Sequence, residues 1–92
     1  MCTKIEVDVK VKNKCGLHVR PASCIAKILQ GYLSKVTLIY KGESVNARSI
    51  MSLMILTIPK NAKIRLVIEG IDARSVMEKL IAAFETRFGE EE

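Results

Sequence analysis

Thr3-Lys4-Ile5-Glu6-Val7-Asp8-Val9-Lys10-Val11-Lys12 is the stretch that decides the fold. From Lys4 onward, charged residues alternate strictly with β-branched apolar ones. A period of two with such side chains predicts a strand with one wet face. An alternation this clean favours an antiparallel sheet that is covered on one side only. The rest of the chain must therefore supply further strands and the helices that cover them.

Outward from this strand, the sequence predicts alternating helices and strands. Pro21 suits the first turn of a helix, where its missing N–H costs nothing. Apolar residues then recur with helical spacing up to Leu29, and Gly31 suits the helix end. Ser49 is a natural N-cap and Pro59 forbids extension, so a short helix is expected between them. The other expected strands are residues 36–40 and 43–46, which form a hairpin around Lys41-Gly42, and residues 64–69.

The last predicted helix begins with Asp72 as its N-cap and ends at Gly89. Its buried stripe comprises Val76, Met77, Leu80, Ile81, Phe84 and Phe88. The element order is thus β-α-β-β-α-β-α. Three helices over one face of a four-stranded antiparallel sheet, an α+β fold, is the economical packing. The pattern does not give the order of the strands in the sheet.

The chain has 92 residues, which is the size of one domain; residues 1–2 and 90–92 are expected to be frayed termini. Cys2, Cys15 and Cys24 form neither a CxxC pair nor an even disulfide framework, which favours a reducing compartment. One histidine and scattered thiols predict no metal site. The first residues do not form a signal peptide, and the longest uncharged stretch, residues 49–59, is too short to span a bilayer. We therefore expect a cytoplasmic protein without direct membrane insertion.

The chain is basic, with a formal net charge of +5 and a pI of about 9.3. This balance fits a nucleic-acid partner, an acidic protein partner or a solvated surface with a slight lysine excess. The basic residues are spread over every predicted element and form no stacking platform with aromatic residues. Nucleic-acid binding is therefore not the expected function.

The only histidine of the chain, His18, lies where a loop meets the helix that Pro21 opens. A lone histidine is more often a surface residue, but a helix start favours an anion, and Arg20 adds a permanent cation that grips phosphate through two donors. Gly16 allows close backbone approach. A neutral imidazole keeps one nitrogen lone pair that can attack phosphorus. The sequence therefore predicts a phosphoryl acceptor at His18, with no cofactor.

Two other chemistries fit the residues less well. The sequence lacks residues that a hydrolase needs, because no carboxylate lies close in sequence to orient His18 and no G-x-S-x-G elbow is present. Cys15, three residues before His18, is weak evidence for a thiol nucleophile. Cys24 is expected to fill space on the first helix.

Two motifs at the right separation resemble one family. Gly16-Leu17-His18-Val19-Arg20-Pro21-Ala22 closely resembles the phosphorylation motif of HPr, the histidine-containing phosphocarrier of the bacterial sugar phosphotransferase system. Val45-Asn46-Ala47-Arg48-Ser49-Ile50-Met51-Ser52-Leu53-Met54 resembles that family's regulatory serine segment, and Gly70-Ile71-Asp72 fits as well. The resemblance runs from about Ile5 to Phe88 and implies an open-faced β-sandwich with the same element order.

The resemblance implies a monomeric carrier rather than an enzyme. His18 would take phosphate on Nδ1 from phosphorylated enzyme I and hand it to the IIA domains of sugar permeases, and Arg20 would bind the phosphoryl group. Ser49 matches the serine that an HPr kinase/phosphorylase modifies in many relatives. The docking residues that the resemblance implies are Val19, Lys27, Ile50, Met51 and Met54.

Several points stay open at the level of sequence. Ser49 is an N-cap, a phosphorylation switch, or both. A regulatory adaptor, nitrogen-type or controlled by a kinase, is the alternative to a sugar carrier, and neither the sugars served nor the presence of a kinase can be read from the chain. The departures from the family pattern are Val19, Ser52, Thr57 and Asn61, with Arg48 in place of a common lysine.

Overall fold

The first strand of the structure is the one that the alternation predicts. The computed structural model describes residues 2–90, and β1 (Thr3–Lys10) half-buries Ile5, Val7 and Val9 while the residues between them are exposed. It pairs antiparallel along its whole length with β4 (Lys63–Gly70). The strand ends two residues before the predicted limit, but Val11 is fully buried and its N–H donates to the Ala62 carbonyl at 2.9 Å.

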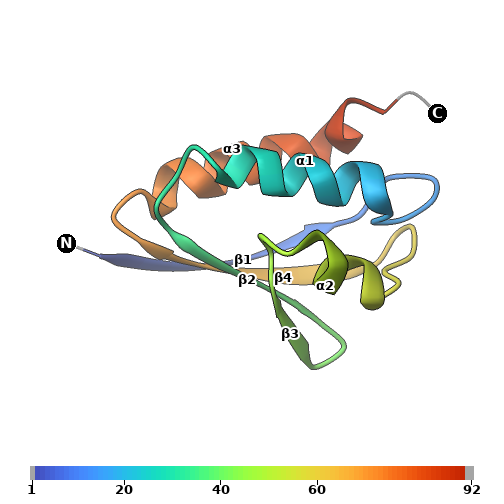
Figure 1. The fold of residues 1–92 in the computed structure, drawn as a ribbon, viewed down its shortest axis with the longest axis horizontal. Helices are drawn as coiled ribbons and strands as arrows, with labels where there is room; N and C mark the ends of the chain where they lie inside the picture. The colour runs from blue at the N-terminus through green and yellow to red at the C-terminus, as the bar shows by residue number, and fades with distance from the viewer. Residues whose placement is uncertain (1, 91–92) are drawn as a thin grey trace.

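The sheet has four antiparallel strands, as predicted, in the order β1-β4-β2-β3. β2 (Lys35–Tyr40) and β3 (Glu43–Asn46) form the expected hairpin. Its two turn residues, Lys41 and Gly42, both have positive φ, at 49° and 79°, which matches the twist of the flanking strands. The turn end of the hairpin projects below the other strands in Figure 1.

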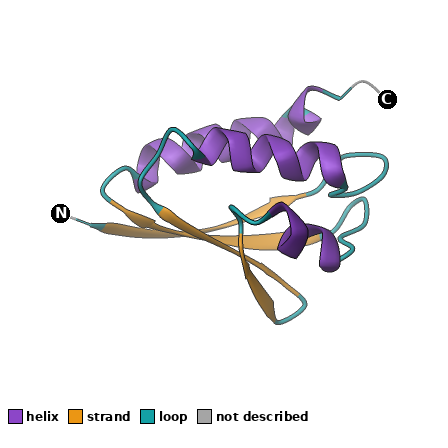
Figure 2. Cartoon of the chain, viewed as in Figure 1, coloured by secondary structure: helices purple, strands orange, loops and turns teal. Residues whose placement is uncertain are grey.

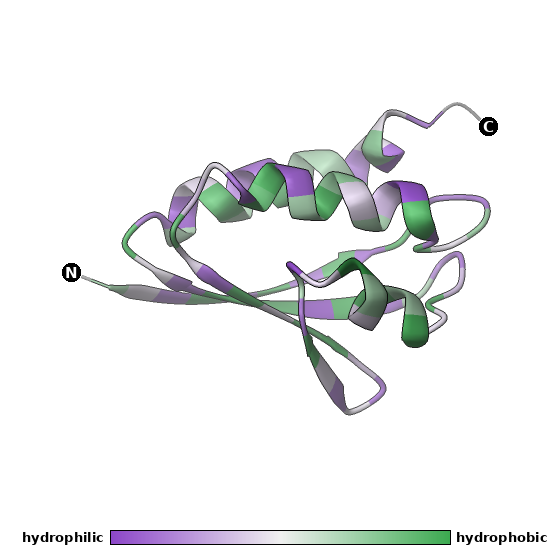
Figure 3. Cartoon of the chain, in the orientation of Figure 1, coloured by the Kyte–Doolittle hydropathy of each residue, from purple (hydrophilic) through white to green (hydrophobic). Residues whose placement is uncertain are grey.

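Three helices cover one face of this sheet (Figure 2). α1 (Val19–Leu29) and α3 (Ala73–Glu85) run side by side over it, and the short α2 (Ile50–Ile55) lies near β3. Hydrophobic and hydrophilic residues alternate around both long helices in Figure 3, as expected for helices with one buried face. The α+β architecture predicted from the pattern is confirmed.

The starts of the first two helices follow the predicted chemistry with one difference. α1 begins at Val19 rather than at Pro21, so Pro21 is the third helical residue and still lies in the turn where an N–H has no partner. Ser49 is the N-cap of α2, as predicted, and its Oγ accepts a hydrogen bond from the Ser52 N–H at 3.2 Å.

Asp72 was predicted to cap the last helix, and its side chain does not do so. Asp72 occupies the N-cap position of α3, but its side chain makes no capping bond. Its carboxylate instead accepts hydrogen bonds from the N–H groups of Leu33 and Ser34, at 2.8 and 3.0 Å, and from the Ser34 hydroxyl. These bonds, led by the one from the Ser34 hydroxyl, lower the pKa of Asp72. The carboxylate therefore joins two loops at the end of the sheet instead of extending a helix.

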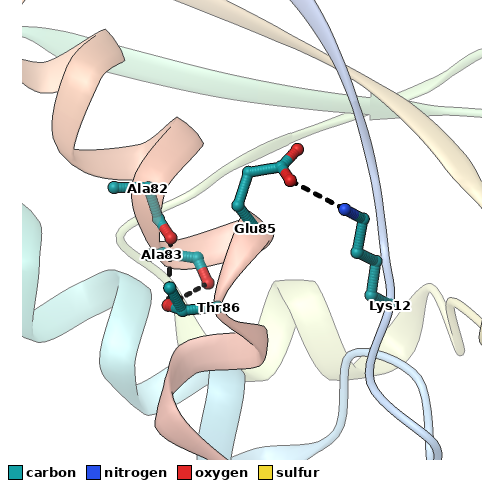
Figure 4. Close-up of polar contacts among 5 residues, drawn as sticks. All are labelled: Lys12, Ala82, Ala83, Glu85 and Thr86. Carbon is teal, nitrogen blue, oxygen red and sulfur yellow. Dashed lines mark hydrogen bonds and ion pairs between the residues drawn. The ribbon is translucent and has the colours of Figure 1, made fainter.

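The last helix is shorter than predicted. α3 ends at Glu85, and a tight turn, η1 (Arg87–Gly89), follows with positive φ at all three residues. Figure 4 shows how the end is fixed: the Thr86 hydroxyl donates to the Ala82 and Ala83 carbonyls, and Lys12 Nζ pairs with Glu85 Oε2 at 2.7 Å. Phe88 therefore lies beyond the helix, where its ring meets Phe84 edge-on at 4.8 Å.

Arg48 holds the end of α1 to the start of β2. Its Nη1 donates to the Leu29 carbonyl at 2.7 Å, and its Nη2 donates to those of Tyr32 and Ser34 at 3.0 and 2.8 Å. The planar, forked guanidinium can reach several carbonyls at once, whereas a lysine ammonium is a single point. The change from a common lysine therefore does more than keep the charge.

Replacement of Arg48 by alanine is expected to lower the free energy of unfolding by about 2–3 kcal/mol, because the carbonyls lose a charged donor. Arg48→Lys should lose less. Urea unfolding measures both, with Arg74→Ala, at an exposed position on α3, as the matched control. Equal losses for Arg48→Ala and Arg74→Ala would contradict this role.

Candidate functional site

His18 is the N-cap residue of α1. Its backbone is extended, with φ −84° and ψ −165°, and its carbonyl accepts the Ala22 N–H at 3.0 Å. Its side chain makes no capping bond, and no acidic residue occupies the first turn. The N–H groups at the start of an 11-residue helix are therefore left with their partial positive charge. Such a helix start attracts an anion next to the imidazole.

The loop that carries His18 is fixed to the segment after α2. Leu17 N–H donates to the Ile58 carbonyl at 2.9 Å, and Gly16 N–H donates to the Asn13 carbonyl at 3.0 Å. Gly16 has φ +70°, and a Cβ added to it would lie 2.2 Å from the Ile58 oxygen. The sequence predicted a close backbone approach at Gly16, and the approach found here is to the protein's own backbone.

His18 and α2 meet at one shallow pocket of about 320 Å³. Met54 lines it from the α2 side, and Thr57, Ile58 and Pro59 line it from the segment that follows. The two motifs singled out in the sequence are thus adjacent in space.

An apolar surface continues from this pocket over α2. We call Met51, Met54 and Ile55 the α2 patch; these side chains are 76%, 41% and 77% exposed. Val19, at the start of α1, is 49% exposed. Ile55 was not among the predicted docking residues, although its solvent-facing position follows from the short helix once Leu53 is buried.

Two of the predicted docking residues, Ile50 and Lys27, lie outside the α2 patch. Ile50 is only half-buried and packs against the core. Lys27 lines a separate groove with Cys24 and the C-terminal end of α3, so the structure does not bring it into the pocket that His18 and Met54 share. Arg20 is exposed, and its guanidinium takes part in none of the ion pairs found within residues 2–90.

The sequence analysis missed two residues at the site, Asn13 and Glu90. Glu90 Oε1 lies 3.1 Å from His18 Nε2, and Asn13 Nδ2 donates to the same oxygen at 2.5 Å. The hydrogen bond from Asn13 is the main cause that lowers the pKa of Glu90; burial opposes it, and the bond and charge of His18 and the charge of Arg20 support it. Glu90 was predicted to belong to a frayed tail, but its contacts with Asn13 and His18 hold it in place. Met1, Glu91 and Glu92, for which fraying was also predicted, lie outside the described residues.

The structure gives little support to a role for the cysteines in catalysis. Cys15 lines the same pocket as His18, but the hydrogen bond that the imidazole makes within residues 2–90 goes to Glu90 and not to the thiol. Cys24 is partly buried on α1. Over the described part of the chain, no group of three or more His, Cys, Asp or Glu residues is placed to hold a metal ion. No helix there is long and apolar enough to cross a membrane.

The comparisons with known proteins agree with one another. The family model described as "PTS HPr component phosphorylation site" matches residues 5–86. The phosphocarrier protein HPr of Chlamydia trachomatis is 42% identical over 87% of this chain and 73% of its own. That of Xylella fastidiosa is 38% identical over 95% of this chain and 98% of its own. A crystal structure of HPr from Thermoanaerobacter tengcongensis, 34% identical, superposes with a TM-score of 0.90 over 96% of this chain and 99% of that one.

Related structures include regulators and dimers. The Bacillus subtilis catabolite repression protein Crh, 35% identical with a TM-score of 0.73 over 86% of this chain and 91% of its own, is described as a swapped dimer. A dimer of the Thermoanaerobacter tengcongensis HPr has also been solved. The expectation of a monomer therefore finds no support in these relatives. With a matching family model and relatives of this identity over most of its length, the chain belongs to the HPr family, in which the HPr proteins themselves are phosphocarriers of the phosphotransferase system and not enzymes.

Proposed function

We propose that this protein accepts a phosphoryl group on His18 from phosphorylated enzyme I and donates it to IIA domains of sugar permeases. The observation that carries the proposal is the position of His18, as the N-cap of a helix whose first N–H groups are unblocked, next to the exposed Arg20. Family membership gives the general role of a carrier. The donor, the acceptors, the residues and the cytoplasmic location are our proposal.

The geometry favours Nδ1 as the attacking atom. Nε2 faces Glu90, whereas Nδ1 has no hydrogen-bond partner among residues 2–90. In the transfer, the Nδ1 lone pair forms a bond to phosphorus while the N–P bond of the donor's phosphohistidine breaks and returns its electron pair to the donor ring. The helix N–H groups and Arg20 stabilise the charge on the transferred group. Positioning and electrostatics suffice for such a transfer.

The α2 patch gives the partners a place to dock. Its side chains are exposed and lie beside the pocket that His18 shares with Met54. Methionines adapt to more than one partner surface, which suits a carrier that meets donor and acceptors in turn. The net charge of +5 favours partners with acidic surfaces.

Ser49 is proposed as a switch. It is partly exposed at the start of α2, and its Oγ accepts the Ser52 N–H. A phosphate there would face the helix N-terminus, so the fold would tolerate it. It would add about two negative charges beside the α2 patch, which would repel an acidic partner.

A regulatory adaptor is the second candidate, because Crh-type proteins are among the relatives at similar identity. An HPr-like protein Crh from Halalkalibacterium halodurans is 41% identical over 88% of this chain. A transfer assay with IIA proteins separates the two, since an adaptor that has lost carrier activity passes on no phosphate.

Incubation with enzyme I and phosphoenolpyruvate is expected to place one acid-labile phosphate on the protein, since phosphohistidine hydrolyses in acid. Intact-mass spectrometry measures it. His18→Ala should abolish the label, and label that persists in that variant would refute the assignment.

Met51→Asp is expected to slow phosphoryl transfer from enzyme I at least about tenfold, because a charge would be buried in an apolar interface. Leu33→Asp is the matched control: Leu33 is also exposed, at 83% against 76% for Met51, but lies at the other end of α1 from His18. Similar slowing in both variants would exclude the α2 patch as the docking surface.

Incubation with an HPr kinase and ATP is expected to phosphorylate Ser49, detected by peptide mass spectrometry, and the modified protein should accept phosphate from enzyme I more slowly. Ser44→Ala, at an exposed serine of β3, should be modified as well as the parent. Absence of phosphate on Ser49, or unchanged transfer after its modification, would argue against the switch.

A further inference from the structure

A carboxylate from the far end of the chain lies against the proposed phosphoryl acceptor. His18 Nε2 and Glu90 Oε1 are 3.1 Å apart, although the two residues are 72 positions apart in the sequence. The His18 side chain is 30% exposed and that of Glu90 is 15% exposed. A pair withdrawn from water to this extent is screened by salt less than a surface pair.

Several contacts fix the segment that carries Glu90. The Thr86 hydroxyl ends α3 by bonding the Ala82 and Ala83 carbonyls (Figure 4), and Phe88 packs against Phe84. The Glu90 N–H then donates to the Arg87 carbonyl at 3.0 Å. The chain therefore reverses tightly after the helix and returns toward His18.

Asn13 joins this segment to the loop that precedes His18. Its Nδ2 donates both to the Arg87 carbonyl, at 2.9 Å, and to Glu90 Oε1, at 2.5 Å. Asn13 is wholly buried, so its amide is a fixed donor rather than a mobile one. The same hydrogen bond is the main cause that lowers the pKa of Glu90, which keeps Glu90 a carboxylate at neutral pH.

The chemistry of the two partners decides where the imidazole proton lies. An ionised carboxylate only accepts hydrogen bonds, so the shared proton must belong to Nε2. In the neutral ring, Nδ1 then carries the lone pair. A hydrogen bond at one ring nitrogen likewise fixes tautomer and ring orientation when the other nitrogen binds an electrophilic metal.

We propose that Glu90 is a positioning residue for His18, which holds the proton on Nε2 and presents the Nδ1 lone pair to the incoming phosphorus atom. This inference rests on the proposed phosphocarrier function. When Nδ1 bonds to phosphorus and the N–P bond of the donor breaks, the ring keeps its Nε2 proton and becomes formally cationic. The Glu90 carboxylate stabilises that charge from the side of the ring opposite to the phosphoryl group.

Two measurements on the full chain test the proposal. The first is nitrogen NMR of the ¹⁵N-labelled imidazole at a pH where the ring is neutral, which reports the nitrogen that carries the proton and needs no phosphoryl donor. The second is the initial rate of phosphorylation by enzyme I and phosphoenolpyruvate. Glu90→Gln removes the charge, and Glu90→Ala also removes the hydrogen bond. Glu85→Gln is the matched control, since Glu85 is an exposed carboxylate of the same end of the chain that pairs with Lys12.

The parent should show the proton on Nε2 in a hydrogen bond that Glu90→Ala loses. Both Glu90 variants should be phosphorylated about tenfold more slowly, as expected when one charge-assisted contact to the transition state is lost, with Glu85→Gln at the parental rate. A proton on Nδ1 in the parent, or Glu90 variants that react as fast as the parent or faster, would overturn the proposal. A parent that takes no label overturns the carrier function, whereas a labelled parent with unaffected Glu90 variants overturns the role of Glu90 alone.

Discussion

The hydrogen bond from the Leu17 N–H to the Ile58 carbonyl, 2.9 Å long, is the contact on which the site depends. It joins the loop that ends in His18 to the segment that leaves α2, so the imidazole and Met54 come to line one pocket. Leu17 and Ile58 are both buried, which protects the bond from competition with water. The approach is so close that only glycine fits at position 16.

A strained residue, Thr57, lies beside this contact. Thr57 has φ +47°, a conformation that a β-branched side chain adopts at a cost of about 1–3 kcal/mol. Its neighbours Leu56 and Ile58 are buried in the core, and its N–H is bonded to the Met54 carbonyl at 3.1 Å. The backbone at Thr57 must therefore turn sharply, which a glycine would do without strain.

The features that could be predicted from the sequence are those whose physical cause is local. Alternation gives β1 its wet face, Ser49 caps the helix that follows it, and His18 meets a helix start within a few residues. The strand order could not be predicted, because it depends on pairings such as Thr3 with Gly70. The role of Asp72 could not be predicted either. An aspartate before a helix suggests a cap, but its carboxylate binds two loop N–H groups and the hydroxyl of the buried Ser34 instead.

The two halves of the site come from different parts of the chain. The cation and the helix start that favour an anion are encoded next to His18, whereas the hydrogen-bond partner of the imidazole is Glu90, which Asn13 holds. Glutamates at the end of a chain have no periodicity or spacing that would distinguish them from a solvated tail. Only the turn after α3, with three consecutive positive φ values at residues 87–89, aims the carboxylate at the ring. Local sequence therefore determines the charge that the site favours, and the tertiary fold determines that His18 Nε2 faces Glu90.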